Sequence, residues 1–398
     1  MDVQAEPLET LRTRTSEKWA EYPADVLPLF VAEMDYPLAE PIAQALADAI
    51  RRSDTGYAGP GRNPLPATFA DFARRRWGWA VDPAHLSTTT DVSVVLVESL
   101  RLSIAPGDDV IITPPIYPPF FDLVPEAGGR VVEVPLLDDG ESWALDLEGI
   151  EAAFAVGARA MLLCNPHNPV GLVHSAAQLA ALAELAARYD ATIISDEIHA
   201  PLCSPGSTDR SLAASLPTAA DAPFTPFLSV SDAAREHGIA AHSASKGWNL
   251  AGLKCALFVT TGERMRTRLS ALPDEVHFRT SLFGRIANAA AFAEGEEWLD
   301  GVLRSIRSNR TLLGELLAEQ LPEVGYRPPA ASYLAWLDLR ALGWGDDPRR
   351  HILKNARVAL NPGHDFGVQG VGFARLNFAC SPSVLTEAVD RIARLPRQ

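Results

Sequence analysis

Cysteine is scarce in this sequence, and long apolar runs are missing. The four cysteines, Cys164, Cys203, Cys255 and Cys380, lie far apart with no Cys-x-x-Cys pair, and only Cys203 has a histidine, His199, at a possible ligand spacing. We therefore expect reduced thiols that pack inside a cytoplasmic protein, and no metal site. The uninterrupted apolar stretches fall well short of the roughly 18 residues that a membrane helix requires.

Positive charge is also in short supply. The chain carries 35 Lys and Arg against 50 Asp and Glu, which gives a net charge of −15. This balance lacks the electrostatic footprint that phosphate backbones or anionic lipids require, so we expect neither nucleic acid nor a membrane surface as a partner. The first 23 residues mix acidic and basic side chains without a central apolar run. That pattern predicts neither a signal peptide nor a transit sequence.

Several common catalytic motifs are absent too. The sequence has no Gly-x-Ser-x-Gly elbow, no Walker loop and no His-Glu-x-x-His. No motif therefore predicts a hydrolase or an NTPase. Gly367-x-x-Gly370-x-Gly372 is a weak match to a dinucleotide loop. Such a loop needs a strand before it and a helix after it, whereas residues 373–379 have the pattern of a strand.

The length and apolar content are ample for a large core. The chain has 398 residues, 47% of them apolar, which predicts two domains. Short β-rich runs alternate with segments of helical period, and this alternation is typical of βαβ units and a parallel sheet in an α/β protein. We expect helices at residues 92–103 and 176–189 to cover a sheet with strands at 109–113, 130–135, 160–164, 192–195, 240–243 and 256–260.

The pattern changes after about residue 285. A long helix is predicted at residues 298–321, and strand-like runs follow at 332–339 and 372–379. We expect a large domain at residues 45–285 and a smaller domain at 286–398. The N-terminal segment, residues 1–44, is expected to join the smaller domain.

Three polar motifs each follow a predicted strand. They are Asn-Pro-His-Asn-Pro-Val-Gly at residues 165–171, Ser-Asp-Glu-Ile-His at 195–199, and the stretch 243–254, which contains Lys246. Because the carboxyl ends of parallel strands meet at one edge of a sheet, where ligand crevices form, we expect a cofactor at that edge. Taken alone, Lys246 could equally be a lysine that extends along the surface to reach solvent.

A lysine, a carboxylate and an amide together suit the chemistry of pyridoxal phosphate (PLP). The lysine forms a Schiff base with the aldehyde of the cofactor, and the carboxylate keeps the pyridine nitrogen protonated so that the ring can accept the electrons of a carbanion. Asp196 suits the role of the carboxylate, and the amide of Asn168 can donate to the 3-oxygen of the ring. Considered singly, both could instead be turn or cap residues.

These motifs, in this order, resemble those of fold-type I PLP enzymes of the class I/II aminotransferase superfamily, and within it the MalY/PatB group of cystathionine β-lyases. The likeness covers nearly the whole chain, from Val31-Ala-Glu-Met-Asp-Tyr-Pro to Arg375-Leu-Asn-Phe-Ala-Cys. It implies a large domain built on a mostly parallel seven-stranded sheet flanked by helices, and a smaller α+β C-terminal domain.

The resemblance also assigns roles around the ring of the cofactor. It implies that Lys246 binds the aldehyde and takes the α proton of the substrate, and that Tyr117 stacks on the ring. Arg375, with Asn168, corresponds to the group that binds the α-carboxylate of the substrate, and a planar guanidinium suits a carboxylate. His199 stands where most aminotransferases carry tyrosine, which is a mark of the lyase group.

The phosphate of the cofactor has its own implied set of residues. Ser243, Lys254 and the backbone N–H groups at Asp91 and Val92, where a helix is predicted to begin, correspond to its binding groups. Tyr57 resembles the residue that reaches the phosphate from a neighbouring subunit, which implies a homodimer with shared sites. Tyr57 and Tyr117 are also the candidate groups near the leaving sulfur.

Three positions depart from the pattern of the family. Asp91 stands where a small residue or glycine is usual, and Pro201 and Thr225 replace residues typical of the β-lyase group. We expect a PLP-dependent carbon–sulfur β-lyase that cleaves L-cystathionine or related S-substituted L-cysteines to thiol, pyruvate and ammonia. A class I/II aminotransferase is the first alternative, and a PLP-binding regulatory protein is the second.

Overall fold

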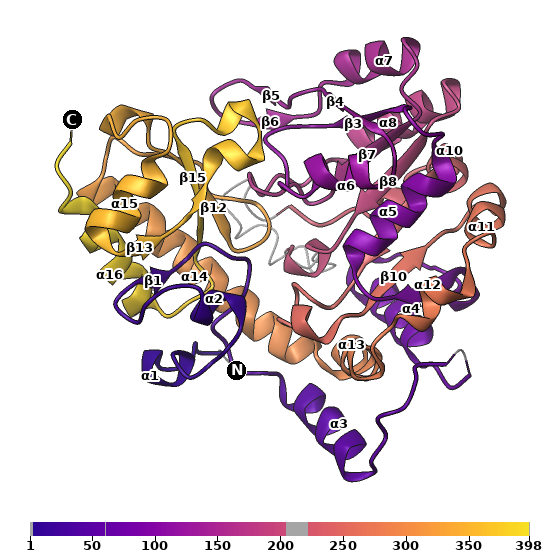
Figure 1. Ribbon diagram of the computed structural model, residues 1–398, viewed down its shortest axis with the longest axis horizontal. Coiled ribbons are helices and arrows are strands. Elements are labelled where there is room, and N and C mark those ends of the chain that lie inside the picture. The colour runs from indigo at the N-terminus through magenta and orange to yellow at the C-terminus, as the bar shows by residue number, and fades with distance from the viewer. Residues whose placement is uncertain (1–2, 60, 204–221, 398) are drawn as a thin grey trace, which may run out of the picture.

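The computed structural model describes residues 3–59, 61–203 and 222–397 and is built around a seven-stranded sheet (Figure 1). The five inner strands of this sheet are buried along nearly their whole length. One of them, β10 (Ala256–Val259), runs antiparallel to both of its neighbours, and the other pairs are parallel. The mostly parallel seven-stranded sheet implied by the resemblance is therefore confirmed. In spatial order the strands are β2 (Leu86–Thr89), β10 (Ala256–Val259), β9 (Gly238–His242), β8 (Thr192–Asp196), β7 (Ala160–Cys164), β3 (Asp109–Ile112) and β4 (Arg130–Glu133).

Helices cover both faces of this sheet. Successive residues of β8 belong to different clusters: Ile194 packs with α5 (Val92–Ser103), and Ile193 packs with α8 (Ala176–Arg188). Because both faces are covered, the inner strands read as continuous apolar runs. Other helices of this part are α4 (Leu65–Trp77), α6 (Phe120–Glu126), α7 (Leu147–Ala155), α10 (Asp232–His237), α11 (Glu263–Leu269), α12 (Asp274–Phe278) and α13 (Leu282–Glu294), with a short hairpin of β5 (Leu137–Asp138) and β6 (Trp143–Ala144).

The C-terminal part forms a second, four-stranded antiparallel sheet beside the long helix α14 (Glu296–Gln320). Its strands, in spatial order, are β11 (Gly325–Tyr326), β12 (Leu334–Asp338), β15 (Phe373–Asn377) and β14 (Asn361–Pro362). Two further helices are α15 (Pro348–Ala356) and α16 (Pro382–Ala393). The glycines at 367, 370 and 372 precede β15 rather than a helix, as expected.

The N-terminal segment packs against this C-terminal part. Strand β1 (Leu27–Pro28) pairs in parallel with β13 (Val358–Ala359). The short helices α1 (Leu8–Leu11) and α2 (Glu17–Ala20) lie beside the C-terminal elements in Figure 1, whereas α3 (Glu40–Arg51) extends away to pack on α13. The exact domain boundaries stay a prediction. Within the described residues, no helix is both long and apolar enough to cross a membrane.

Candidate active site

The three polar motifs meet at one edge of the large sheet. Strands β7, β8 and β9 run parallel and end at Cys164, Asp196 and His242, so the loops that follow them lie side by side. They open onto a cavity of about 470 Å³. Nine of the predicted site residues line this cavity: Asp91, Val92, Tyr117, Asn168, Asp196, His199, Lys246, Lys254 and Arg375.

Lys246 places its amine inside this cavity. The Nζ atom donates a hydrogen bond to the carbonyl oxygen of Ala32 at 2.9 Å. Burial, together with the nearby positive charge of Arg375, lowers the pKa of Lys246 to about 8. A lysine with this pKa is neutral in about one molecule in ten at pH 7, far more often than a lysine with its ordinary pKa. The neutral amine is the form that acts as nucleophile or base.

Asp196 lies at the end of β8 and is buried. Its Oδ1 accepts a hydrogen bond from the Ile198 N–H at 3.1 Å, and burial raises the pKa of its carboxyl group to about 7. No Lys or Arg in the described part of the chain forms an ion pair with it. A buried carboxylate that faces a cavity without a cationic partner suits a positively charged ring N–H, so the donor set here fits PLP.

Arg375 comes from β15, in the C-terminal sheet, and is also buried. Its Nη1 donates to Asn168 Oδ1 at 3.1 Å and its Nη2 donates to the Phe30 carbonyl at 3.0 Å, while Nε is buried without a partner. Burial lowers the pKa of Arg375 to about 10. Across residues 3–59, 61–203 and 222–397, no carboxylate lies at ion-pair distance from it, so this planar fork suits the carboxylate of a ligand.

The start of α5 shows how an acidic residue, Asp91, is accommodated beside the expected phosphate site. Its Oδ1 accepts a hydrogen bond from the Val94 N–H at 3.0 Å and so caps the helix. Its Oδ2 lies 3.1 Å from Lys254 Nζ. The carboxylate is thus turned onto the helix and neutralised by a lysine, and the N–H groups of the first turn remain a suitable place for an anion.

The structure brings Ser245, rather than the predicted Ser243, to the wall of the cavity. The hydroxyl of Ser243 donates to the Cys255 carbonyl at 2.7 Å and accepts from the Ser245 N–H at 3.1 Å, so it is occupied by the protein itself. The two serine hydroxyls lie 2.7 Å apart. Tyr57 does not line the cavity either, and its side chain is 93% exposed.

His199 and Tyr117 are both uncharged at neutral pH. The Nδ1 of His199 lies 3.0 Å from Ser332 Oγ, and burial lowers the pKa of the imidazole to about 3. Burial, with the charge of Asp196, raises the pKa of Tyr117 to about 12. The phenol of Tyr117 therefore keeps its proton and can act as a hydrogen-bond donor in the cavity.

Residues 30–36, which we call the strap, overlap the first motif of the resemblance, but sequence reasoning assigned them no role in the site. The main-chain carbonyl groups of the strap reach into the site: Phe30 O accepts from Arg375, and Ala32 O accepts from both Lys246 and the Tyr333 hydroxyl. No side-chain pattern marks a backbone acceptor. Only the fold could show that the strap contacts Lys246 and Arg375.

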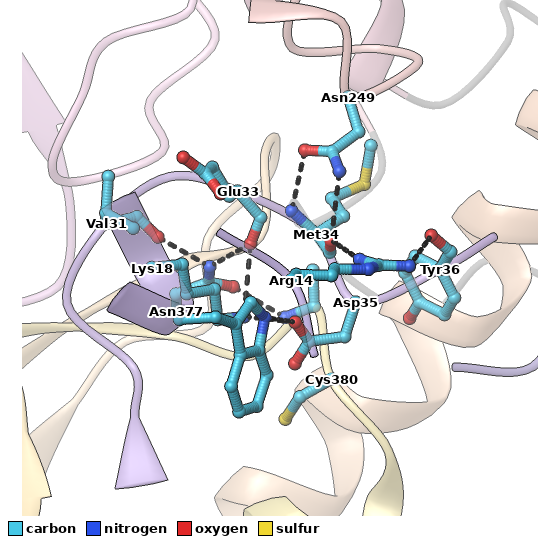
Figure 2. A network of polar contacts seen from close by, with 12 residues as sticks. Arg14, Lys18, Val31, Glu33, Met34, Asp35, Tyr36, Asn249, Asn377 and Cys380 are labelled. Atoms are coloured by element: carbon cyan, nitrogen blue, oxygen red, sulfur yellow. Dashed lines mark hydrogen bonds and ion pairs between the residues drawn. The ribbon is translucent and has the colours of Figure 1, made fainter. Parts of the chain in front are cut away.

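A network of buried polar contacts fixes the strap (Figure 2). Lys18 of α2 forms a buried ion pair with Asp35 at 2.8 Å and donates to the Glu33 carbonyl at 3.2 Å. Because both charged groups are removed from water, loss of either would leave the other uncompensated. The pair therefore ties α2 firmly to the strap.

Two asparagines attach the strap to the segments that carry Lys246 and Arg375 (Figure 2). Asn249, three residues after Lys246, exchanges two hydrogen bonds with the main chain of Met34, at 2.9 and 3.0 Å. Asn377, two residues after Arg375, donates to the carbonyl groups of Val31 at 2.7 Å and Glu33 at 2.6 Å. Their close spacing to Lys246 and Arg375 is the only sequence signal that could have pointed to them.

Residues 24–392 match the family model described as aminotransferase class I and II, and the chain belongs to this family. It is 36% identical to the cystathionine beta-lyase of Corynebacterium glutamicum, over 97% of this chain and 98% of that protein, and 32% identical to the cystathionine beta-lyase PatB of Bacillus subtilis, over 92% of each. The crystal structure of cystalysin from Treponema denticola, which contains a pyridoxal 5'-phosphate cofactor, superposes with a TM-score of 0.88 at 25% identity, over 99% of this chain and 98% of that one. The resemblance drawn from the motifs is confirmed.

Proposed function

We propose that this protein is a PLP-dependent carbon–sulfur β-lyase that cleaves L-cystathionine or related S-substituted L-cysteines to thiol, pyruvate and ammonia. The observation that carries the proposal is one cavity holding a lysine whose pKa is about 8 and a buried arginine without a carboxylate partner. Such a pair suits an amino-acid substrate. The two named β-lyases at 36% and 32% identity favour elimination over transamination.

The residues present fit the cofactor. Lys246 would bind its aldehyde, Asp196 would face the ring nitrogen, Tyr117 would stack on the ring, and Asn168 would donate to the ring oxygen. Lys254, Ser245 and the first N–H groups of α5 would hold the phosphate, with Ser243 supporting Ser245. When bound, PLP supplies an electron-withdrawing ring that stabilises negative charge at the α carbon of the substrate.

The side chains of the protein then have distinct tasks. Arg375 holds the α-carboxylate of the substrate through its paired N–H groups, and Asn168 fixes the guanidinium. The neutral amine of Lys246 accepts the α proton, and the Ala32 carbonyl keeps that amine oriented. Tyr57 and Tyr117 are the candidate groups near the leaving sulfur, and the protonated phenol of Tyr117 would donate to it as the carbon–sulfur bond breaks.

We further propose a cytoplasmic homodimer, with domains at residues 45–285 and 286–398 and the segment 1–44 attached to the second. The nearly complete exposure of Tyr57 supports a role for this residue in the site of the partner subunit. A mixture of Tyr57→Phe and Lys246→Ala homodimers tests this proposal after subunit exchange. If the sites are shared, each hybrid dimer regains one intact site, and activity rises above the sum of the parents.

The reaction is tested with purified holoprotein and L-cystathionine in the absence of any oxo acid, with Lys246→Ala as the control. Release of pyruvate and free thiol in equal amounts by the natural protein alone is the expected result. Turnover that occurs only when an amino acid and a 2-oxo acid are supplied together would assign the protein to the aminotransferases instead.

A further inference from the structure

One charged side chain on the wall of the cavity has no role in the reaction described above. Glu17, the first residue of α2, lines the same cavity as Lys246 and Arg375. The other carboxylates of the wall have neighbours or tasks: Asp91 pairs with Lys254, Asp196 suits the ring nitrogen, and Asp365 lies 3.4 Å from His364. Glu17 has no ion-pair partner in the part of the chain that the structure describes.

Glu17 is held at this place by its neighbour in the sequence. Lys18 is buried and forms the ion pair with Asp35 shown in Figure 2, and Trp19 donates through Nε1 to the same carboxylate at 3.2 Å. Because consecutive helical residues point about 100° apart, anchoring Lys18 against the strap leaves Glu17 directed elsewhere, toward the cavity. The negative charge of Glu17 also helps to raise the pKa of Lys246 against the effect of burial.

The charges of the cavity wall restrict the side chain of the substrate. Arg375 is reserved for the α-carboxylate, Lys254 is paired with Asp91, and Lys246 handles the α proton. Among the described residues of this chain, the wall therefore offers no further Lys or Arg to a negative group on the sulfur substituent. Glu17 and Asp365 make the remaining charged surface acidic. A substituent that ends in an ammonium group is complementary to it, and an anionic one is repelled.

We propose that Glu17 is a specificity-determining residue that binds a positive charge at the end of the sulfur substituent. The inference rests on the proposed function and narrows its preferred substrates toward S-aminoalkyl L-cysteines. L-Cystathionine also offers an ammonium group to Glu17, but its far end carries a carboxylate as well, which the acidic wall disfavours.

Binding tests this proposal without requiring any reaction at sulfur. L-Lysine and L-norleucine share a four-carbon chain, differ in the terminal ammonium group, and carry no leaving group on Cβ. Their Kd values are measured by titrating the holoprotein and following the absorbance of the cofactor. In Glu17→Gln we expect the ratio of the L-norleucine Kd to the L-lysine Kd to fall by about three- to fivefold, the upper part of the range for an exposed ion pair. High salt should reduce this ratio in the natural protein.

The matched control is Glu21→Gln, which removes an exposed carboxylate at the end of the same helix but away from the cavity. The ratio of the two Kd values should not change in this variant. An unchanged ratio in Glu17→Gln, an equal weakening of both ligands, or the same change in Glu21→Gln would each overturn the proposal.

Turnover provides the second measurement. S-(2-Aminoethyl)-L-cysteine and S-propyl-L-cysteine are compared by kcat/KM, and Glu17→Gln should lower the preference for the first by the same three- to fivefold. If neither thioether yields pyruvate while the Kd ratio still shifts, the lyase proposal fails and the recognition by Glu17 stands. If both are cleaved and Glu17→Gln leaves their ratio unchanged, the lyase proposal stands and the role of Glu17 is wrong.

Discussion

On the sheet side of the cavity, Asp196 ends β8, and Lys246 and Asn168 lie in the loops that follow β9 and β7. On the strap side, the contacts come from main-chain carbonyl groups. The Ala32 carbonyl meets Lys246 from a position 214 residues away in the sequence. The large sheet therefore supplies the reactive groups, and the strap supplies acceptors that orient them. The two sides should fail in different ways when they are altered.

The two sides also differ in how their charges are balanced. On the strap side, the buried charges of Lys18 and Asp35 compensate each other at 2.8 Å. In the cavity, Arg375 is buried and Lys246 is partly buried, and neither cation has a carboxylate partner among the described residues. Burial and the charge of Arg375 lower the pKa of Lys246. Uncompensated charge costs stability in the absence of ligand, and active sites commonly carry that cost because function needs it.

The largest effect is expected on the sheet side, from Asp196→Asn. The amide cannot carry the negative charge that keeps the ring nitrogen protonated, so kcat for pyruvate release should fall by ~10²–10³-fold, the range for loss of one preorganised electrostatic contact. KM should change little. The control is Asp365→Asn, which removes a different carboxylate from the same wall. A decrease below tenfold in Asp196→Asn, or equal decreases in both variants, would contradict the assigned role.

Arg375→Lys tests the residue that contacts both sides, Asn168 on the sheet side and the Phe30 carbonyl on the strap side. Lysine keeps the positive charge but loses the fork that contacts Asn168 and the Phe30 carbonyl together. We expect kcat/KM to fall by ~10²-fold, mostly through KM, as for loss of a buried charge-assisted contact. Steady-state kinetics with S-propyl-L-cysteine separates this outcome from that of Asp196→Asn. A change confined to kcat would show that Arg375 does not hold the substrate.

The strap itself is tested by Asn377→Ala against Asn309→Ala. Asn309 is a matched control because it also donates to two main-chain carbonyl groups, those of Phe378 at 2.9 Å and Cys380 at 2.7 Å, neither of which belongs to the strap. Both variants should lower the free energy of unfolding by ~2–3 kcal/mol, because buried acceptors lose their donors. Only Asn377→Ala should also raise KM, by roughly fivefold. Equal KM values in the two variants would leave the strap with a structural role alone.

Much of the sheet side could be predicted from the sequence. Strands β7 and β8 are buried on both faces, so their apolar runs are unbroken, and the polar motif after each one stands out. Strand β2 was missed because Leu86-Ser-Thr-Thr has a single apolar residue and owes its strand to pairing with β10. A local pattern cannot report a partner strand that lies about 170 residues further along the chain.

Other parts of the site could not be predicted from any local pattern. Ser243 and Ser245 are two residues apart, and which of them faces the cavity depends on the Cys255 carbonyl that occupies Ser243. The acceptors of the strap are main-chain carbonyl groups, which every residue possesses. The side chains at positions 30 and 32 therefore do not predict these contacts. Contacts of this kind are set by tertiary structure.

The smallest expected effect concerns stability without the cofactor. Burial lowers the pKa of Lys246 to about 8, so between pH 8 and the higher pKa of an unfolded lysine the unfolded chain binds more protons than the folded one. The free energy of unfolding therefore rises with pH across that window, because the folded protein no longer has to hold a charged Lys246. Below pH 8 the ammonium group is present in the folded protein, and its full cost in stability applies. Lys246→Met, which keeps the length and removes the charge, should raise the Tm of cofactor-free protein at pH 7 by about 2–4 °C. This gain should shrink as the pH is raised toward 10.

The control is Lys254→Met, which removes an exposed lysine from the same wall, where it pairs with Asp91. This variant should give no gain in Tm at any pH. If the gain in Tm of Lys246→Met did not depend on pH, the two variants would differ because of packing and not because of the charge of Lys246.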